Sequence, residues 1–378
     1  MGRLFARAVG FLGFAVGVAL VPRLLCSAGT GSAYAGDRAT EEQTARAVDG
    51  WIRRGFGESS FATGSALFDE EWIFGTYQMA ALGFGQVALE HPEEAALDRE
   101  RMERAMDRML APAGHQFDTA AWHHDGLAGL DGLEAHAAFF GYANLVLSLH
   151  RKIYGESKYS ALNDRMTAAL VRRYVASRYL PIETYPGETY PVDNTAGIAS
   201  IALHAKATGK PEPVLAKLLA AFRLHSVDAK TGLLIQSLHH DGSRLDAPRG
   251  SGTTLGAYFM SFGDPAFSYE LHTAVQRELA TRILGFRVVS EYPSSVVGGK
   301  GDIDSGPLLF GYSVSATGFA IAACRIHRDE TCYRELLSTA NLFGVPFDRG
   351  DAGRTFVAGG PLGDAILFAM QTAHAGVA

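Results

Sequence analysis

Two aspartates stand two residues apart in the glycine-rich stretch GDIDSGPLLFGY, residues 301–312. A pair of carboxyl groups with different pKa values can perform acid and base catalysis, one donating a proton while the other activates water. Asp302 and Asp304 could instead cap a helix, because acidic side chains are preferred where a helix begins. One cap would explain only one of the two carboxylates. We therefore predict that Asp304 is a catalytic carboxyl group, with Asp302 in reserve.

A second acidic segment, YPVDNTAGIAS (190–200), precedes another apolar stretch. Asn194 or Thr195 can cap a helix that begins here, which leaves the Asp193 carboxylate available for chemistry. Glu188 lies five residues earlier, in ETYPGETYP. We predict that Asp193 is the second catalytic carboxyl group and Glu188 its reserve. The acid and base roles stay open, because they depend on distances that the sequence does not give.

Aromatic and polar side chains near these acids could bind a substrate. Tyr185, Tyr190 and Tyr292 lie in predicted loops, where their rings could stack on the face of a sugar. Arg249 and Ser251, in PRGSGTT, could orient an anionic or polyhydroxyl group. Carboxyl groups combined with aromatic rings are typical of a site that cleaves a C–O bond, as in a glycosidic linkage.

Helical periodicity runs through nearly the whole chain, in segments of two kinds. Six segments are rich in Gly, Ala and aromatic residues and nearly free of charge in their middles, so each should be buried on most sides. They are residues 72–89, 133–155, 195–209, 252–262, 306–327 and 361–373. Six others have one apolar and one charged face, and these are residues 40–54, 95–110, 160–175, 213–225, 266–284 and 330–343. The alternation predicts an all-α fold, an (α/α)6 toroid of six inner and six outer helices; a helical array of open curvature is the alternative.

In such a toroid the inner helices run parallel, because one antiparallel outer helix separates each from the next. The segments that precede them should therefore meet at one mouth, and these are residues 67–72, 122–134, 183–194, 245–252, 298–307 and 356–364. Because they are long and rich in acids, aromatics and glycines, we expect function at this mouth. Asp131 and Glu134 fit a capping box before the second inner helix. The DG turn within 232–247 indicates a hairpin in a loop.

Several other classes of function find little support. The net charge is −6, with acids and bases interleaved and no basic stripe, so no nucleic-acid partner is expected. The sequence has no Walker-type loop, no dinucleotide fingerprint after a strand and no G-x-S-x-G elbow. The histidine pairs at 123–124 and 239–240 lack the HExxH or cysteine-rich spacing of metal sites. We therefore predict no metal site and no cofactor.

The first 35 residues have the order of a secretory signal peptide. Two arginines precede an apolar run, and the AYA at 33–35 offers a small-x-small cleavage site. We therefore expect a leader (1–35) and a single toroid domain (36–378), exported to the periplasm or the exterior. An uncleaved leader that anchors the chain to a membrane is the alternative. Export would permit a disulfide between Cys324 and Cys332, although two unpaired thiols fit the sequence equally well.

Two of the predicted inner segments resemble a known family. GLEAHAAFFGYANLVLSLHRKIYGESKY (132–159) and YPVDNTAGIASIALHAKATG (190–209) are similar to the central inner segments of linalool dehydratase/isomerase-like toroids. That family is itself similar in fold to the (α/α)6 glycoside hydrolases and lyases. Glu71 and Tyr77 match a carboxylate and a tyrosine that the family places six residues apart. The resemblance implies that both contribute to the substrate site.

The chain departs from the family pattern at two positions. Tyr142 follows Gly141 where the family carries a histidine, and Asp193 precedes Asn194 where it carries a cysteine. The resemblance thus implies that Tyr142 and Asn194 contribute to the substrate site. It does not carry over thiol-assisted chemistry on a terpene alcohol, and a carboxylate-based acid/base reaction fits these residues better.

The sequence therefore predicts an exported, carboxylate-dependent enzyme that acts on a C–O bond of a small molecule or an oligosaccharide, of glycoside hydrolase or lyase type. One alternative is a dehydratase or isomerase of a hydrophobic alcohol, since the aromatic residues in AAFFGYANL and AYFMSF could line an apolar pocket. Another is a ligand-binding toroid without catalysis, which requires only a concave mouth.

Overall fold

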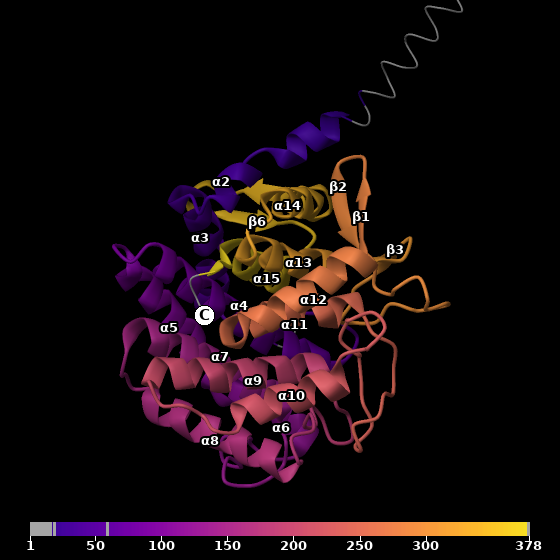
Figure 1. Ribbon diagram of the computed structural model, residues 1–378. Helices are drawn as coiled ribbons and strands as arrows, with labels where there is room; N and C mark the ends of the chain where they lie inside the picture. The colour runs from indigo at the N-terminus through magenta and orange to yellow at the C-terminus, as the bar shows by residue number, and fades with distance from the viewer. Residues whose placement is uncertain (1–16, 18–19, 58–59, 376–378) are drawn as a thin grey trace, which may run out of the picture.

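The computed structural model describes residue 17 and residues 20–57 and 60–375. Within this part of the chain, six helices form an inner ring and six cover it (Figure 1). The inner helices are α4 (Ala66–Glu90), α7 (Ala137–Tyr154), α9 (Pro191–Thr208), α11 (Gly250–Gly263), α13 (Val314–Ile326) and α15 (Gly360–Thr372). The outer helices are α3 (Arg38–Arg54), α5 (Ala95–Leu110), α8 (Ser160–Ala176), α10 (Leu215–Ser226), α12 (Pro265–Glu278) and α14 (Glu330–Gly344).

The inner ring is closed. Each inner helix contacts the next along the chain, and the last, α15, packs against the first, α4. This closure confirms the (α/α)6 toroid and excludes the open array. Glycines allow the inner helices to approach closely, because a Cβ atom on Gly141 of α7 would lie 2.9 Å from the backbone nitrogen of Gly197 on α9.

Several outer helices begin at an aspartate that caps them. The side chain of Asp37 accepts a hydrogen bond from the Thr40 amide at 2.9 Å at the start of α3. Asp264 and Asp329 accept equivalent bonds from amides in the first turns of α12 and α14, at 3.0 and 2.9 Å. An N-cap of this kind satisfies an amide that has no partner within the helix. These acids are therefore explained by local helix stability.

The segment before α13 differs from the prediction. Helix α13 begins at Val314, and a hairpin of β3 (Leu308–Leu309) and β4 (Tyr312–Ser313) occupies the first residues of the predicted helix 306–327. Its two turn residues, Phe310 and Gly311, have positive φ angles of 55° and 86°, as a two-residue turn of this type requires. The side chain of Ser313 caps α13 by accepting from the Ala316 amide at 3.1 Å. Asp302 and Asp304 are therefore not caps of this helix.

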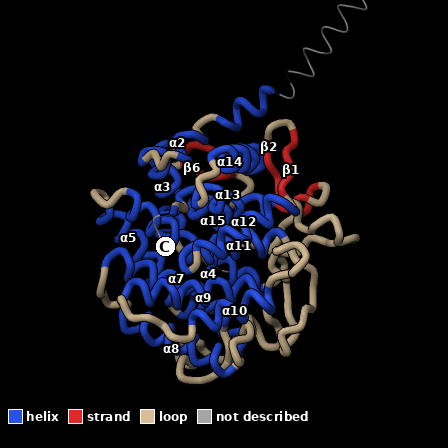
Figure 2. Tube along the Cα trace, in the orientation of Figure 1, coloured by secondary structure: helices blue, strands red, loops and turns tan. Residues whose placement is uncertain are grey.

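A second hairpin shortens the predicted outer helix 266–284. Helix α12 ends at Glu278, and β1 (Ala280–Ile283) pairs with β2 (Phe286–Val289) around a turn at 284–285 in which both residues have positive φ. Residues 232–247 form a loop with isolated β-bridges rather than regular strands. The remaining short elements are α2 (Thr30–Tyr34), α6 (Gln116–Trp122), the 3-10 turns Pro112–Gly114 and Gly350–Ala352, and the pair β5 (Pro346–Asp348) and β6 (Arg354–Phe356). Figure 2 shows the longest loops at the right-hand side of the helical body.

Residues 1–16 and 18–19 of the predicted leader lie outside the described residues. Its final part, α2, packs on α14, where the Tyr34 and Tyr333 rings meet edge to face with centroids 5.4 Å apart (Figure 1). The expected boundary between leader and toroid, at residue 35, thus lies between α2 and α3, which contact each other. Among the described helices none is long and apolar enough to cross a membrane. Cys324 on α13 and Cys332 on α14 form a disulfide, one of the two possibilities that the sequence left open.

Candidate active site

Asp193 lies buried in the first turn of α9, which begins at Pro191. Its carboxylate accepts a hydrogen bond from the Tyr142 hydroxyl on α7 and another from the Thr184 hydroxyl, at 2.6 Å. The predicted neighbour Asn194 does not cap the helix. Its side-chain oxygen accepts from the Ile182 amide at 2.8 Å and its nitrogen donates to the Ile182 carbonyl at 3.0 Å, so it fixes the loop that carries Thr184.

Glu71 lies in the second turn of α4 and is half-buried. The Tyr185 hydroxyl lies beside the Glu71 carboxyl group. This hydroxyl makes no hydrogen bond of regular geometry to any described residue. Burial and the negative charges of Asp304 and Asp193 raise the pKa of Glu71 to about 8. At neutral pH this carboxyl group therefore holds a proton.

Asp304 lies in the loop before β3, and its side chain remains exposed to solvent. No described residue forms a hydrogen bond or an ion pair with its carboxyl group, and the cap of α13 is Ser313. The surrounding protein and the charges of Asp302 and Asp193 raise the pKa of Asp304 to about 7.

We refer to Glu71, Asp193 and Asp304 as the mouth carboxyls. Asp193 contributes to raising the pKa of both other members, so the three groups lie within electrostatic reach of one another. Burial raises the pKa of Asp193 as well, against the two hydrogen bonds that favour its charged form. None of the three forms an ion pair with a described lysine or arginine. The structure thus brings together carboxyl groups from α4, α9 and the loop before β3.

Tyrosines surround these acids. Burial and the mouth carboxyls raise the pKa of both Tyr142 and Tyr185, so their hydroxyls stay protonated and can donate hydrogen bonds. Burial likewise raises the pKa of Tyr190, which also senses Asp304 and Asp193. The Tyr190 hydroxyl donates to Glu188 at 2.7 Å, and Glu188 itself is exposed at the outer rim.

Asp302 was predicted as a reserve acid and Arg249 as a substrate-binding residue, but the two form a separate ionic group next to the mouth carboxyls. Arg249 pairs with Asp302 and with Asp246, the latter at 2.8 Å, and lies over the ring of Tyr292 at 5.4 Å. Although burial opposes it, the Ser305 amide and the Arg249 charge hold the pKa of Asp302 below its usual value. Asp302 therefore stays ionised and paired, unlike Asp304, and makes a poor substitute for it.

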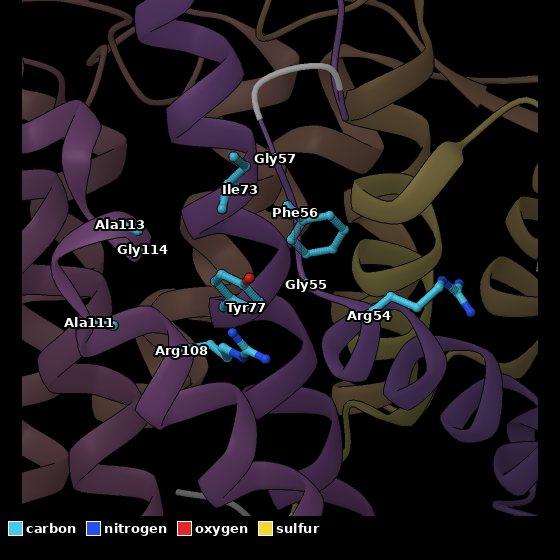
Figure 3. Close-up of a pocket in the computed structure, with 10 residues that line it drawn as sticks. All are labelled: Arg54, Gly55, Phe56, Gly57, Ile73, Tyr77, Arg108, Ala111, Ala113 and Gly114. Atoms are coloured by element: carbon cyan, nitrogen blue, oxygen red, sulfur yellow. The ribbon is translucent and has the colours of Figure 1, made fainter.

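Neither Ser251 nor Tyr77 bonds to a mouth carboxyl, although Glu291, the partner of Ser251, lies within electrostatic reach of Asp304. The Ser251 hydroxyl donates to buried Glu291 at 2.6 Å, so it has a structural partner already. Tyr77 lines a different cavity of about 330 Å³, together with Arg54, Phe56 and Arg108 (Figure 3). Six residues along a helix correspond to a rotation of roughly 240°, so Glu71 and Tyr77 face in different directions on α4. The spacing in the family pattern therefore does not give them a common site here.

Two residues that hold the site together were not identified from the sequence. Thr184 donates to Asp193, and Glu291 holds the segment that starts α11 by accepting from Ser251. Thr184 lies in the acidic loop 183–194, which was recognised as a candidate segment. Glu291 lies two residues after the end of β2, within a segment predicted only as loop.

No protein-family model matches the chain, and no curated protein does. A solved structure with a similar fold is the unsaturated glucuronyl hydrolase of Bacillus sp. GL1, which is responsible for the degradation of glycosaminoglycan. The two chains superpose with a TM-score of 0.52 over 88% of this chain and 95% of that chain, at 10% sequence identity. The shared property is the toroid fold. The narrower resemblance to linalool dehydratase/isomerase-like proteins stays a prediction.

Proposed function

We propose that this protein is an exported enzyme that cleaves a C–O bond in a carbohydrate, as a glycoside hydrolase or a lyase. The observation that carries the proposal is the set of mouth carboxyls, which lie on separate elements within electrostatic reach of one another and form no ion pair with a described lysine or arginine. Three carboxyls that serve only stability would be expected to have partners, because uncompensated acids near one another destabilise a fold. A structural neighbour that acts on a glycosaminoglycan supports the same class.

The environments of Glu71 and Asp193 suit complementary roles. Glu71, with a pKa of about 8, carries a proton at pH 7 and can give it to the leaving oxygen of a glycosidic bond. Asp193 accepts hydrogen bonds from Tyr142 and Thr184, which favour its ionised form. As a base it would take a proton from the water that attacks the sugar carbon. Glu71 then ends deprotonated and Asp193 protonated, and exchange with solvent restores both.

Asp304 and the tyrosines would complete the substrate site. Asp304 lies where solvent reaches it and would contact a substrate hydroxyl at the rim. Tyr185 and Tyr190 would stack on sugar rings or donate hydrogen bonds to them. The leader supports export, as expected from its charged start and apolar run.

A second candidate reaction is the dehydration of a hydrophobic alcohol. Tyr142 packs against the rings of Phe74 and Phe259, with centroids 6.4 and 5.2 Å away, so one side of the mouth carboxyls is apolar. The same proton donor would protonate an alcohol oxygen, and loss of water would leave an alkene.

The proposal is tested by turnover on a panel of neutral and uronic-acid oligosaccharides and of terpene alcohols. The wild-type protein is compared with Glu71→Gln, Asp193→Asn and Asp304→Asn. Asp131→Asn is the matched control, since this acid has a side chain 91% exposed. New reducing ends, lost in the Glu71 and Asp193 variants but kept in the control, would support glycoside cleavage; alkene formation would support the second candidate. Ligand retention without any product would contradict both.

A further inference from the structure

A separate cluster of ionisable groups lies between α6 and α7. His124 Nε2 is 3.3 Å from His136 Nε2 and 2.8 Å from Glu134 Oε2. The ligand atoms of these three side chains all lie within 4.8 Å of one another. The capping box predicted for Glu134 does not form, because α7 begins only at Ala137. Glu134 is thus free to face the histidines.

The hydrogen bond of the His124 ring fixes its tautomer. Its Nδ1 lies 2.9 Å from the carbonyl oxygen of Trp122, and a carbonyl can only accept. The proton is therefore on Nδ1. The lone pair of Nε2 points towards His136 and Glu134.

A hydrogen bond also fixes the tautomer of His136, which is completely buried. Its Nδ1 lies 3.0 and 2.9 Å from the two carboxylate oxygens of buried Asp118, so it donates there and Nε2 keeps its lone pair. Two lone pairs and a carboxylate oxygen then converge within hydrogen-bond distance. This arrangement is repulsive unless a positive charge lies between them. A carboxylate behind the distal nitrogen of a histidine is also the usual second-layer arrangement at metal sites.

The spacing of the two histidine nitrogens fits a transition metal, and the Glu134 oxygen, 2.8 Å from His124 Nε2, would have to move outward slightly to bind the same ion. Zinc–nitrogen bonds of about 2.0–2.1 Å in a tetrahedron place two ligand nitrogens about 3.3 Å apart, which is the separation of the two Nε2 atoms. Two imidazoles and one carboxylate favour zinc over calcium or magnesium, which prefer oxygen ligands. The Glu134 side chain is 58% exposed, so a fourth position can be filled by water.

We propose that His124, Glu134 and His136 bind a divalent transition metal ion, zinc in the first place, and that Asp118 orients His136. The ion would also stabilise the loop at the mouth that contains Thr184. The Trp122 ring stacks on His136 with centroids 4.6 Å apart, and its Nε1 donates to the Thr184 carbonyl at 3.3 Å. Since Thr184 also binds Asp193, the metal site would stabilise the loop that holds this acid.

The test is zinc binding to the full chain after treatment with a chelator, followed by calorimetry and by metal analysis. The wild-type protein is compared with His124→Ala and Glu134→Gln, whose side chains are partly exposed and can be replaced with little effect on folding. His240→Ala is the control, since its side chain is 95% exposed on another loop. Asp118→Asn tests the positioning role.

We expect one zinc ion per wild-type chain and per His240→Ala chain. The affinity should fall at least about 100-fold in His124→Ala and Glu134→Gln, and about 10- to 100-fold in Asp118→Asn. Calcium and magnesium should not compete. Absence of zinc binding to the wild type would overturn the proposal. Equal zinc binding by the wild type and both ligand variants would overturn it too. Neither result depends on whether the protein cleaves a glycan.

Discussion

The two ends of the toroid both place acidic side chains among the inner helices, but they compensate them differently. At the distal end, where the inner helices finish, Glu41 and Glu90 pair with the buried guanidinium of Arg325 at 3.5 and 2.9 Å. His91 Nε2 lies 3.0 Å from Glu41. At the mouth, where the inner helices begin, none of Glu71, Asp193 and Asp304 forms an ion pair with a described lysine or arginine, and only Asp304 senses a cation, Arg249, at longer range.

Helix dipoles favour this division. The last carbonyls of a helix carry partial negative charge and attract cations, whereas its first amides attract anions. Arg325 follows the rule by donating to the Gln371 carbonyl at 2.9 Å, near the end of α15. Asp193 follows it in the first turn of α9.

A raised pKa alone does not distinguish the two ends. Burial raises the pKa of Glu41 to about 7, the same value as for Asp304. The difference is the fixed counter-charge. Paired acids explain stability, while unpaired acids that converge in a solvent-accessible region indicate chemistry.

The largest effect should come from removing a mouth carboxyl. Glu71→Gln and Asp193→Asn should each lower turnover about 10²- to 10⁴-fold, the usual contribution of a positioned acid or base. Circular dichroism and thermal unfolding should show an intact fold. Full activity in either variant would mean that the mouth is no more catalytic than the distal end.

At the distal end, a comparable change should affect stability instead. Arg325→Met leaves Glu41 and Glu90 without their cation, so the free energy of unfolding should fall by about 3–5 kcal/mol in urea titrations. Arg334→Met, which removes an exposed pair with Glu330, should cost less than about 1 kcal/mol. Turnover per folded molecule should be unchanged in both. Equal losses of stability would refute the special role of the buried pair.

A smaller effect of opposite sign is expected at the mouth. Folded Glu71 keeps its proton up to pH about 8, whereas the unfolded chain releases it near pH 4.5. Because only the unfolded state ionises between these values, the free energy of unfolding falls as the pH rises through this range. Glu71→Gln should therefore stabilise the protein by roughly 1–3 kcal/mol at pH 8 and by almost nothing at pH 4.5. For Asp131→Asn, the change in the free energy of unfolding should be the same at both pH values. Destabilisation at pH 8 would show that Glu71 has a favourable partner.

The smallest effect should come from the hydrogen bonds to Asp193. The Tyr142 hydroxyl lowers the pKa of Asp193, so Tyr142→Phe should raise that pKa and move the acidic limb of the pH–rate profile to higher pH. The loss of one such bond is expected to reduce activity about tenfold. Tyr292→Phe, which removes only a bond to the Lys300 carbonyl, serves as the control. If the acidic limb of the pH–rate profile does not move in Tyr142→Phe, Asp193 is not the catalytic base.

The sequence predicted the toroid because helical periodicity with two kinds of face is a property of each segment by itself. Asp193 and Asp304 could also be predicted, Asp193 because its neighbours Asn194 and Thr195 are possible caps, and Asp304 because one cap cannot explain two carboxylates. Glu71 lies in the acid-rich segment 67–72 that was expected at the mouth, but only the resemblance singled it out from its acidic neighbours. Hairpins at 284–285 and 310–311 were missed, because the apolar runs on either side of Gly285 and Gly311 were interpreted as helical.

The contacts across the fold could not be predicted. Thr184 reaches Asp193 and Ser251 reaches Glu291 through tertiary packing, which leaves no periodic pattern. The absence of a metal site was predicted from the spacing of adjacent histidines. His136 was hidden in a predicted inner helix, and its proximity to His124 depends on the path of the loop between α6 and α7. The proposed zinc site contradicts the prediction of no metal site, and the zinc-binding measurement decides between them.

The most direct test of the account is the pKa of Glu71, because it requires no substrate. Carboxyl-carbon NMR of glutamate-labelled protein, compared with Glu71→Gln to assign the signal, measures it directly. Unpaired mouth carboxyls predict a titration near pH 8, moving downward in Asp193→Asn as one neighbouring charge is removed. A titration near 4.5 in the wild type, unaffected by Asp193→Asn, would contradict the claim that these acids meet without compensation.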